Sequence, residues 1–237
     1  YGPRGGQAVM PPGLPRLTVT MEARVIRHSP PAGFDMSAPL AALPDQIALI
    51  RDLGPEAPHH FLPPSPRLPA SAAITTFARQ ATTAATTVRE AVEALGRALH
   101  AEMTFDADAT EGDTPAEAAF AGRHGVCQDF AQIMIAGLRS LGIPAAYVAG
   151  YLRPLPPPGK PRLEGADAMH AWVRAWTGAE AGWVEYDPTN ACWVAEDHIV
   201  VGYGRDYGDV APVIGMLRLD GSQMGSHKVD IRPEGEA

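Results

Sequence analysis

The sequence predicts an α+β fold, in which a helix that carries a cysteine packs on an antiparallel sheet that carries a histidine and an aspartate. The helix is indicated by apolar residues at three- and four-residue spacing from Phe130 to Leu141, directly after Cys127. The sheet is indicated by two segments of strand character, 168–176 and 182–187, which a Thr-Gly turn separates. Further helices are expected ahead of the cysteine.

The composition disfavours several classes of partner. The hydrophobic share of 46% and the charged share of 19% are ordinary for a globular protein. A formal charge of −8 argues against nucleic acid, because phosphate binding needs a basic surface. We find neither an apolar run of membrane-spanning length nor a signal-peptide pattern, so we expect no membrane partner. Two cysteines do not make a disulfide framework, and we expect a reducing, cytoplasmic compartment.

The N-terminal part of the chain is expected to stand apart from the rest. Residues 17–25 alternate between apolar and polar side chains, which predicts one half-buried strand. Prolines punctuate residues 29–45 and 54–70. We therefore predict a short β-rich region with a Pro-rich linker over 1–70, and a larger core domain over 71–237.

Helices are predicted between this linker and the cysteine. Residues 71–103 lack proline, and apolar side chains from Phe77 to Leu99 keep a helical period, which predicts two helices. Thr114-Pro115 followed by Glu117 is typical of an N-cap, a proline at the first helical position and an acidic first turn. This pattern predicts a short helix that ends at about Ala121.

Cys127 is predicted to lie in the first turn of its own helix. Gly125 allows a tight turn before this helix, and Gly142 with Pro144 ends it. At a helix N-terminus, unpaired N–H groups and the macrodipole favour a thiolate over a thiol. The alternative is a structural cysteine, since buried free cysteines are common and inert. Asp129 cannot share the face of Cys127 by helical spacing, and we expect it to anchor the helix start.

The second half of the chain supplies strands. Residues 145–152 read as a strand, residues 153–165 as a Pro-rich loop, and 213–219 as a further strand near the end. His170 lies in the first segment of the hairpin and Asp187 ends the second. Antiparallel pairing would bring this imidazole and this carboxylate side by side. His170 could act as the base for a thiol nucleophile, and Asp187 could be the acceptor that orients this base.

Each residue also has a less specific explanation. A lone strand histidine is commonly a packed group, and Asp before Pro is a routine turn residue. A zinc site is a further alternative, with His124, Cys127, His170 and Asp187 as ligands and Cys192 as a spare. Structural zinc sites usually contain more than one closely spaced Cys or His pair, and this sequence has only the pair His124 and Cys127. We therefore favour a catalytic triad of Cys127, His170 and Asp187, and expect no metal and no cofactor.

Three motifs together resemble a known family. Gly-Val-Cys-Gln-Asp-Phe-Ala (125–131), Met-His-Ala-Trp-Val (169–173) and Val-Glu-Tyr-Asp-Pro-Thr-Asn (184–190) are similar to motifs of the transglutaminase-like superfamily, in its bacterial branch of papain-like cysteine enzymes. The resemblance covers about residues 70–215, including the family's closing segment at 202–212. It implies a papain-like fold with Cys127 as nucleophile, His170 as general base and acid, and Asp187 as the residue that orients the imidazole.

The resemblance also implies a reaction. Attack by the Cys127 sulfur on a peptide or side-chain amide would give a thioester, which then passes to water or to an amine. We favour hydrolysis, because transfer needs a site that excludes water. The backbone N–H of Cys127 is one expected oxyanion donor. The candidates for the second donor stay open: His100, His124, Gln128 and Trp172.

The tryptophans and the expected substrate are the last features that the sequence addresses. Four tryptophans, at 172, 176, 183 and 193, surround the hairpin; core packing explains most of them, and Trp172 is the candidate for substrate contact. A protein or peptide substrate is the expected partner. The alternative to an enzyme is a catalytically silent binding or scaffold module, against which the intact Cys, His and Asp argue.

Overall fold

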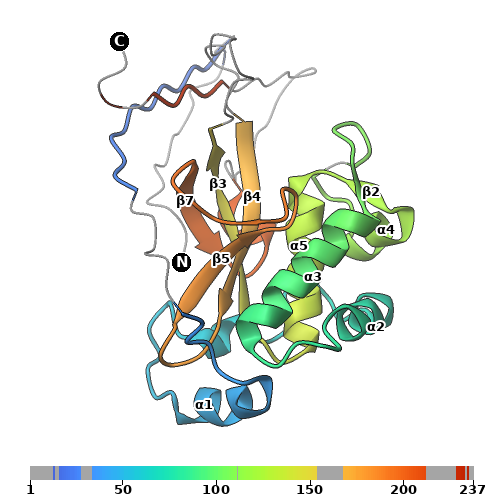
Figure 1. Ribbon diagram of the computed structural model, residues 1–237. Coiled ribbons are helices and arrows are strands. Elements are labelled where there is room, and N and C mark those ends of the chain that lie inside the picture. Colours follow the sequence, from blue (N-terminus) through green and yellow to red (C-terminus); the bar gives the residue numbers. More distant parts are fainter. Residues whose placement is uncertain are drawn as a thin grey trace.

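A five-stranded antiparallel sheet forms the centre of the protein. The computed structural model describes residues 13, 16–27, 34–110, 112–153, 168–211, 228–232 and 234. Across the sheet the strands run in the order β6 (Cys192–Trp193), β5 (Trp183–Asp187), β4 (Ala168–Trp176), β3 (Ala145–Leu152) and β7 (His198–Gly204). All neighbours in this sheet are antiparallel. In Figure 1 the longer helices stand together on one side of these strands.

The helices mostly precede the sheet in the chain. In order they are the 3-10 helix η1 (Leu40–Ala42), α1 (Leu43–Leu49), the 3-10 helix η2 (Pro58–Phe61), α2 (Ala72–Ala81), α3 (Val88–Glu102), α4 (Ala116–Gly122), α5 (Cys127–Ser140) and α6 (Tyr207–Val210). A small parallel pair, β1 (Thr104–Phe105) and β2 (His124–Gly125), lies beside the start of α5. Within the described residues, four α-helices therefore precede the helix that carries the cysteine.

Helix α5 is the central helix of the molecule. It packs on β4 and β3 and is covered by α2, α3 and α4. Its residues from Asp129 to Ile135 are all buried, including the polar Gln132. Because neighbours surround α5, burial extends around the helix instead of following one face. The position of Cys127 at its first turn is thus fixed from several sides.

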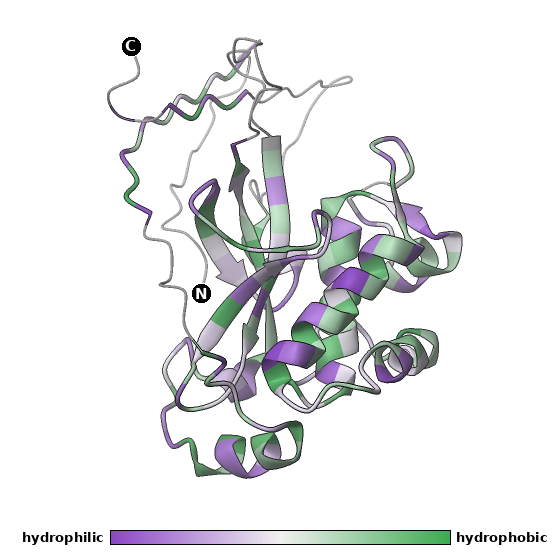
Figure 2. Cartoon of the chain, viewed as in Figure 1, coloured by the Kyte–Doolittle hydropathy of each residue, from purple (hydrophilic) through white to green (hydrophobic). Residues whose placement is uncertain are grey.

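Helix α3 shows why these segments are helical. Thr87 caps it by accepting from the Glu90 N–H, and the Glu90 side chain accepts from the Thr87 N–H in return. Its buried positions recur every three or four residues: Val88, Ala91, Val92, Leu95, Gly96 and Leu99. Figure 2 shows hydrophobic and hydrophilic residues alternating around this helix, as expected where one side packs on the core.

The predicted α+β fold is confirmed, with the cysteine helix packed on the antiparallel sheet. Helices α2 and α3 occupy the segment 71–103, and strands β3, β4 and β5 occupy the three predicted segments. Helix α4 begins one residue later than expected, because Pro115 is its N-cap residue and not its first helical residue. Gly142 adopts a φ of +79° just after α5, as a C′ glycine does.

The N-terminal prediction was wrong in its secondary structure. Residues 16–27 form no strand, and Val19 and Met21 stay 79% and 75% exposed. A strand needs a partner for its N–H and C=O groups, and no described segment forms a ladder with this one. Residues 34–70 contain helix and not strand. Leu43 and Leu68 are buried in the main core, so this part of the supposed linker packs as part of the fold.

The C-terminal part adds a strand that the sequence patterns had not indicated. β7 pairs with β3, and α6 follows it directly within the closing segment. The strand predicted over 213–219 and most of the loop predicted over 153–165 lie outside the described residues. Among the helices that the structure describes, none combines the length and apolar character needed to cross a bilayer.

Candidate active site

Asp129 anchors the start of α5, as predicted. Its Oδ2 accepts from the Val126 N–H at 2.9 Å and from the Thr110 hydroxyl at 2.6 Å, and its side chain is fully buried. Val126 is the N-cap residue, so the bond satisfies an N–H that precedes the helix. These contacts fix the backbone on which Cys127 is the first helical residue.

His170 and Asp187 meet across the β4–β5 hairpin. The His170 Nε2 lies 2.7 Å from the Asp187 Oδ2, and the two side chains are 8% and 0% exposed. The imidazole and the carboxylate therefore lie side by side, as predicted. Burial opposes the charged carboxylate, but hydrogen bonds from His170 and His198 outweigh it and hold the pKa of Asp187 well below its usual range.

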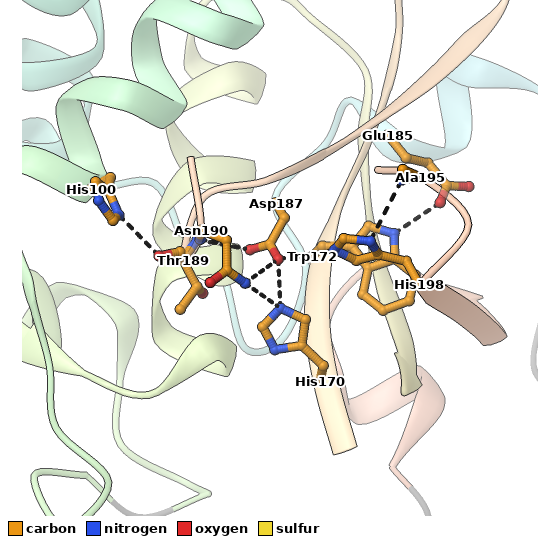
Figure 3. A network of polar contacts seen from close by, with 9 residues as sticks. All are labelled: His100, His170, Trp172, Glu185, Asp187, Thr189, Asn190, Ala195 and His198. Carbon is orange, nitrogen blue, oxygen red and sulfur yellow. Dashed lines mark hydrogen bonds and ion pairs between the residues drawn. The ribbon is translucent and has the colours of Figure 1, made fainter. Parts of the chain in front are cut away.

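The Asp187 carboxylate is held by residues on three sides. Its Oδ1 accepts from the N–H groups of Thr189 and Asn190, at 2.9 and 3.1 Å. Its Oδ2 accepts from the Asn190 amide at 2.7 Å and from the His198 Nε2 at 3.1 Å, in addition to His170. Figure 3 shows Asn190 and His170 converging on this carboxylate. Five donors leave the side chain little freedom to turn.

Cys127 completes the group from the other side of His170. Burial disfavours the imidazolium, but hydrogen bonds to Asp187 and to the Cys127 side chain outweigh this and raise the pKa of His170 to about 9. Because Nε2 is engaged by Asp187, Nδ1 is the ring nitrogen that remains for the sulfur. The structure thus brings together the three residues that the sequence had singled out.

Known proteins that are similar to this chain indicate its family. The family model described as "Transglutaminase-like superfamily" matches residues 75–188, a range that includes Cys127, His170 and Asp187. An uncharacterized protein of Mycobacterium tuberculosis is 36% identical over 243 residues, which cover 93% of this chain and 72% of that protein. The chain belongs to the transglutaminase-like superfamily. This membership confirms the resemblance drawn from the three motifs.

Two further proteins are similar to parts of this chain. A protein-glutamine gamma-glutamyltransferase of Pseudomonas aeruginosa is 40% identical over 87 residues, or 36% of this chain and 13% of that protein. A crystal structure of a proposed cysteine protease from Cytophaga hutchinsonii has 28% sequence identity and a TM-score of 0.55. The match covers 71% of this chain, and the chain spans about half of that protein, 54%.

Two site residues were missed by the sequence patterns. Asn190 lies in the third transglutaminase-like motif, three residues after Asp187, where an Asx-type turn could have indicated its contact. His198 begins β7, and the β-branched run after it, Ile199 to Val201, could have indicated that strand. Neither signal indicates that the His198 ring contacts Asp187, because β7 and β5 are not neighbours in the sheet.

Trp172 does not line a surface in this transglutaminase-like fold. Its side chain is fully buried, and its Nε1–H donates to the Glu185 carboxylate at 2.8 Å. The structure therefore gives it a packing role instead of the substrate contact that was predicted. Its indole N–H is also engaged and not free to serve an oxyanion. The Gln128 amide is engaged as well, with the Gly112 carbonyl at 3.1 Å.

The zinc alternative requires a ligand set that the structure does not assemble. Among the described residues, the clustered metal-type donors are His170, Asp187 and His198, whose atoms lie within 4.8 Å of one another. His124 is exposed, and neither it nor Cys127 belongs to this cluster. Both imidazole Nε2 atoms hydrogen-bond to one Asp187 oxygen, so hydrogen bonding already accounts for the closeness of the three.

Proposed function

We propose that the protein is a thiol-dependent enzyme that cleaves peptide or side-chain amide bonds through Cys127, His170 and Asp187. The observation that carries the proposal is the buried imidazole of His170, which is hydrogen-bonded to the Asp187 carboxylate at 2.7 Å and whose pKa is raised by Asp187 and by the Cys127 side chain. Cys127 as nucleophile, His170 as base and Asp187 as orienting acceptor together match the arrangement of a cysteine acyl-transfer site. Membership of the superfamily supports the same assignment.

The first chemical step is attack by the Cys127 sulfur on the amide carbonyl carbon. His170 already holds the proton of the Cys127 thiol, so the sulfur attacks as a thiolate, and a tetrahedral intermediate forms with its negative charge on the former carbonyl oxygen. The first N–H groups of a helix have no intrahelical acceptor, and Cys127 is the first residue of α5. Its backbone N–H is therefore the donor we assign to that oxygen.

His170 then acts as an acid. With a pKa raised to about 9, the imidazole carries a proton at neutral pH, and Asp187 stabilises this charge. As the carbon–nitrogen bond breaks, His170 gives its proton to the leaving ammonia or amine, and a thioester to Cys127 remains. Attack by water, with His170 now as base, releases the acid product and restores the thiol.

Water is the acceptor we propose, and an amine is the second candidate. Water is always present, whereas transfer needs a site that keeps it out. The second candidate is kept because one relative is named as a protein-glutamine gamma-glutamyltransferase. The substrate we propose for either reaction is a protein or peptide.

The acceptor is tested by giving the enzyme a glutamine-containing protein with and without a fluorescent primary amine. Peptide fragments, or glutamate in place of glutamine, found by mass spectrometry would support hydrolysis. Label incorporation would support transfer, and ammonia released from a glutamine side chain accompanies both reactions. Cys127→Ser is the control, because it keeps the size of the side chain while replacing the sulfur. Activity that persists in this variant would contradict the proposed nucleophile.

A silent binding module is the competing interpretation. A protein that only binds has no need for a buried histidine whose pKa is raised by its neighbours, nor for a carboxylate with five donors. Lack of any product with a broad set of glutamine-containing proteins, together with ordinary thiol reactivity at Cys127, would favour that interpretation.

A further inference from the structure

We propose that His198 is a positioning residue of this site, which acts on His170 through the Asp187 carboxylate by taking a share of its negative charge. This inference rests on the proposed function, because it assigns His198 a part in the same reaction. His198 does not touch the reacting sulfur in our assignment. It acts through Asp187.

His198 reaches Asp187 from a different part of the sheet. Strand β7 lies at one edge, and β4 and β3 separate it from β5, which ends at Asp187. His198 is the first residue of β7, opposite Leu152 of β3, and its ring is buried. Its Nε2 nevertheless lies 3.1 Å from the Asp187 Oδ2. The chain that follows Asp187 therefore returns to support the carboxylate.

The second ring nitrogen defines the tautomer of His198. The Ala195 N–H donates to the Nδ1 at 3.5 Å, so this nitrogen has a lone pair and carries no proton. The Nε2 then carries the single ring proton and donates it to Asp187. His198 is in this way a neutral donor, whereas His170 is the imidazole that exchanges its proton during the reaction.

The His198 ring is held in place from its other side. Trp172 packs against it edge to face, with ring centroids 5.2 Å apart. The Trp172 indole is fixed by Glu185, which also accepts from the Tyr203 hydroxyl at 3.0 Å. In Figure 3, Trp172 and His198 lie together beside Asp187, away from Asn190 and His100. This explains why a tryptophan in the histidine motif is buried.

The charge argument gives His198 a measurable effect. The groups that act on His170 are Asp187 from β5 and Cys127 from α5, and Asn190 also contacts its ring nitrogen. Cys192 pairs opposite Asp187 across β5 and β6. A carboxylate oxygen that loses one donor becomes more basic, and its ion pair with an imidazolium becomes stronger. Four other bonds keep Asp187 in place, so loss of the His198 donor should raise the pKa of His170.

The test measures the pKa of His170 by NMR titration in the full chain, in the wild type and in two variants. His198→Phe keeps the aromatic contact with Trp172 and removes the donor. We expect it to raise the pKa of His170 by about half a unit to one unit, and to lower turnover about tenfold with KM unchanged. His198→Gln restores an N–H donor and should return both values toward those of the wild type. An unchanged pKa in His198→Phe would overturn the proposal.

A measurement on the wild type keeps the proposal falsifiable if a variant fails to fold. Nitrogen chemical shifts of the His198 ring should show a protonated Nε2 and an unprotonated Nδ1. The opposite tautomer would overturn the inference. The proposed function has a separate test: it fails if the wild-type protein shows no turnover and the Cys127 thiol reacts no faster than an ordinary thiol. The effect of His198 on the His170 pKa would still be measurable in that case.

Discussion

Gly125 and Asp129 are in such close contact that no side chain fits between them. A Cβ at Gly125 would lie 2.6 Å from the Asp129 Oδ2 and 2.8 Å from its Cβ. Gly125 does not have a positive φ, so the glycine is needed for space and not for the tight turn that the sequence suggested. The glycine two residues before Cys127 and the aspartate two residues after it thus form one device, which sets where the helix begins.

The first prediction concerns this anchor. Asp129→Ala should lower the free energy of unfolding by about 1–3 kcal/mol, because the Val126 N–H and the Thr110 hydroxyl lose a buried acceptor. It should also slow alkylation of Cys127, since the first turn of α5 loses its fixed position. Thr110→Val is the matched control, which removes one donor and leaves the bond to Val126. Chemical unfolding and intact-mass analysis measure the two effects, and equal behaviour of Asp129→Ala and the wild type would contradict the anchoring role.

Local patterns were sufficient for much of this fold. The structure contains the helix predicted around Val88 and Leu95 and the hairpin predicted around Thr177-Gly178. Both form because local propensity and tertiary packing agree there. The segment 17–25 shows the limit of the same reasoning. Its alternation describes one face of a strand, but a strand also requires a neighbour, and one segment alone carries no information about its neighbour.

The catalytic candidates could be predicted for a similar reason. Cys127 and Asp187 occupy ends of elements, and His170 contacts Asp187 across a hairpin whose turn is visible in the sequence. The contact of His198 with Asp187 joins strands that are not neighbours. It depends on the path of the whole chain, which no local pattern records.

A second prediction compares the two thiols of the native protein. Cys127 and Cys192 are both partly exposed, so access alone does not separate them. Burial, and then the charge of Asp187, raise the pKa of Cys192, whereas Cys127 has an imidazolium beside it. Iodoacetamide at mildly acidic pH should therefore modify Cys127 at least tenfold faster. Peptide mapping gives both rates in one sample, and slow, equal modification would count strongly against a catalytic Cys127.

The third prediction concerns pH and stability. The pKa of His170 is raised in the folded state from its ordinary 6.5 to about 9. Protonated His170 therefore stabilises the folded state fully below pH 6.5, and this stabilisation is lost as the pH rises through 9. The pKa of Asp187 is lowered, so its contribution is present above its ordinary 3.8 and is lost as the pH falls below that value. The loss at high pH should be on the order of 3 kcal/mol.

Urea unfolding between pH 6 and pH 10 measures this loss. His170→Gln is the comparison, because it has no proton to lose in that range. A wild-type curve that runs parallel to the curve of this variant up to pH 10 would show that His170 is not held as an imidazolium.

The fourth prediction concerns metal. Exhaustive chelation should leave both the thermal unfolding temperature and the alkylation rate of Cys127 unchanged, since hydrogen bonds already link His170, Asp187 and His198. Elemental analysis before and after chelation checks that the treatment was effective. Stoichiometric zinc in the purified protein, with unfolding upon its removal, would establish the metal-binding alternative in place of the triad.

The last prediction separates the orienting role of Asp187 from its structural role. Asp187→Ala removes the acceptor of five hydrogen bonds from a fully buried position, and it leaves His170 and His198 without their partner. We expect a loss of about 3–5 kcal/mol in the free energy of unfolding, as when one member of a buried pair is removed. Turnover should also fall, but that fall alone would not distinguish misfolding from misorientation.

Asp187→Asn makes this distinction. Its amide oxygen can still accept from the Thr189 and Asn190 N–H groups, while its NH₂ group, in the place of Oδ2, cannot accept from His170 or His198. This variant should therefore lose less stability than Asp187→Ala and still lose turnover by about 10⁴-fold, because the imidazole is held in the wrong tautomer. Cys127 should remain present and open to slow alkylation in both variants. Near wild-type turnover in a folded Asp187→Asn protein would show that His170 does not depend on this carboxylate for its orientation.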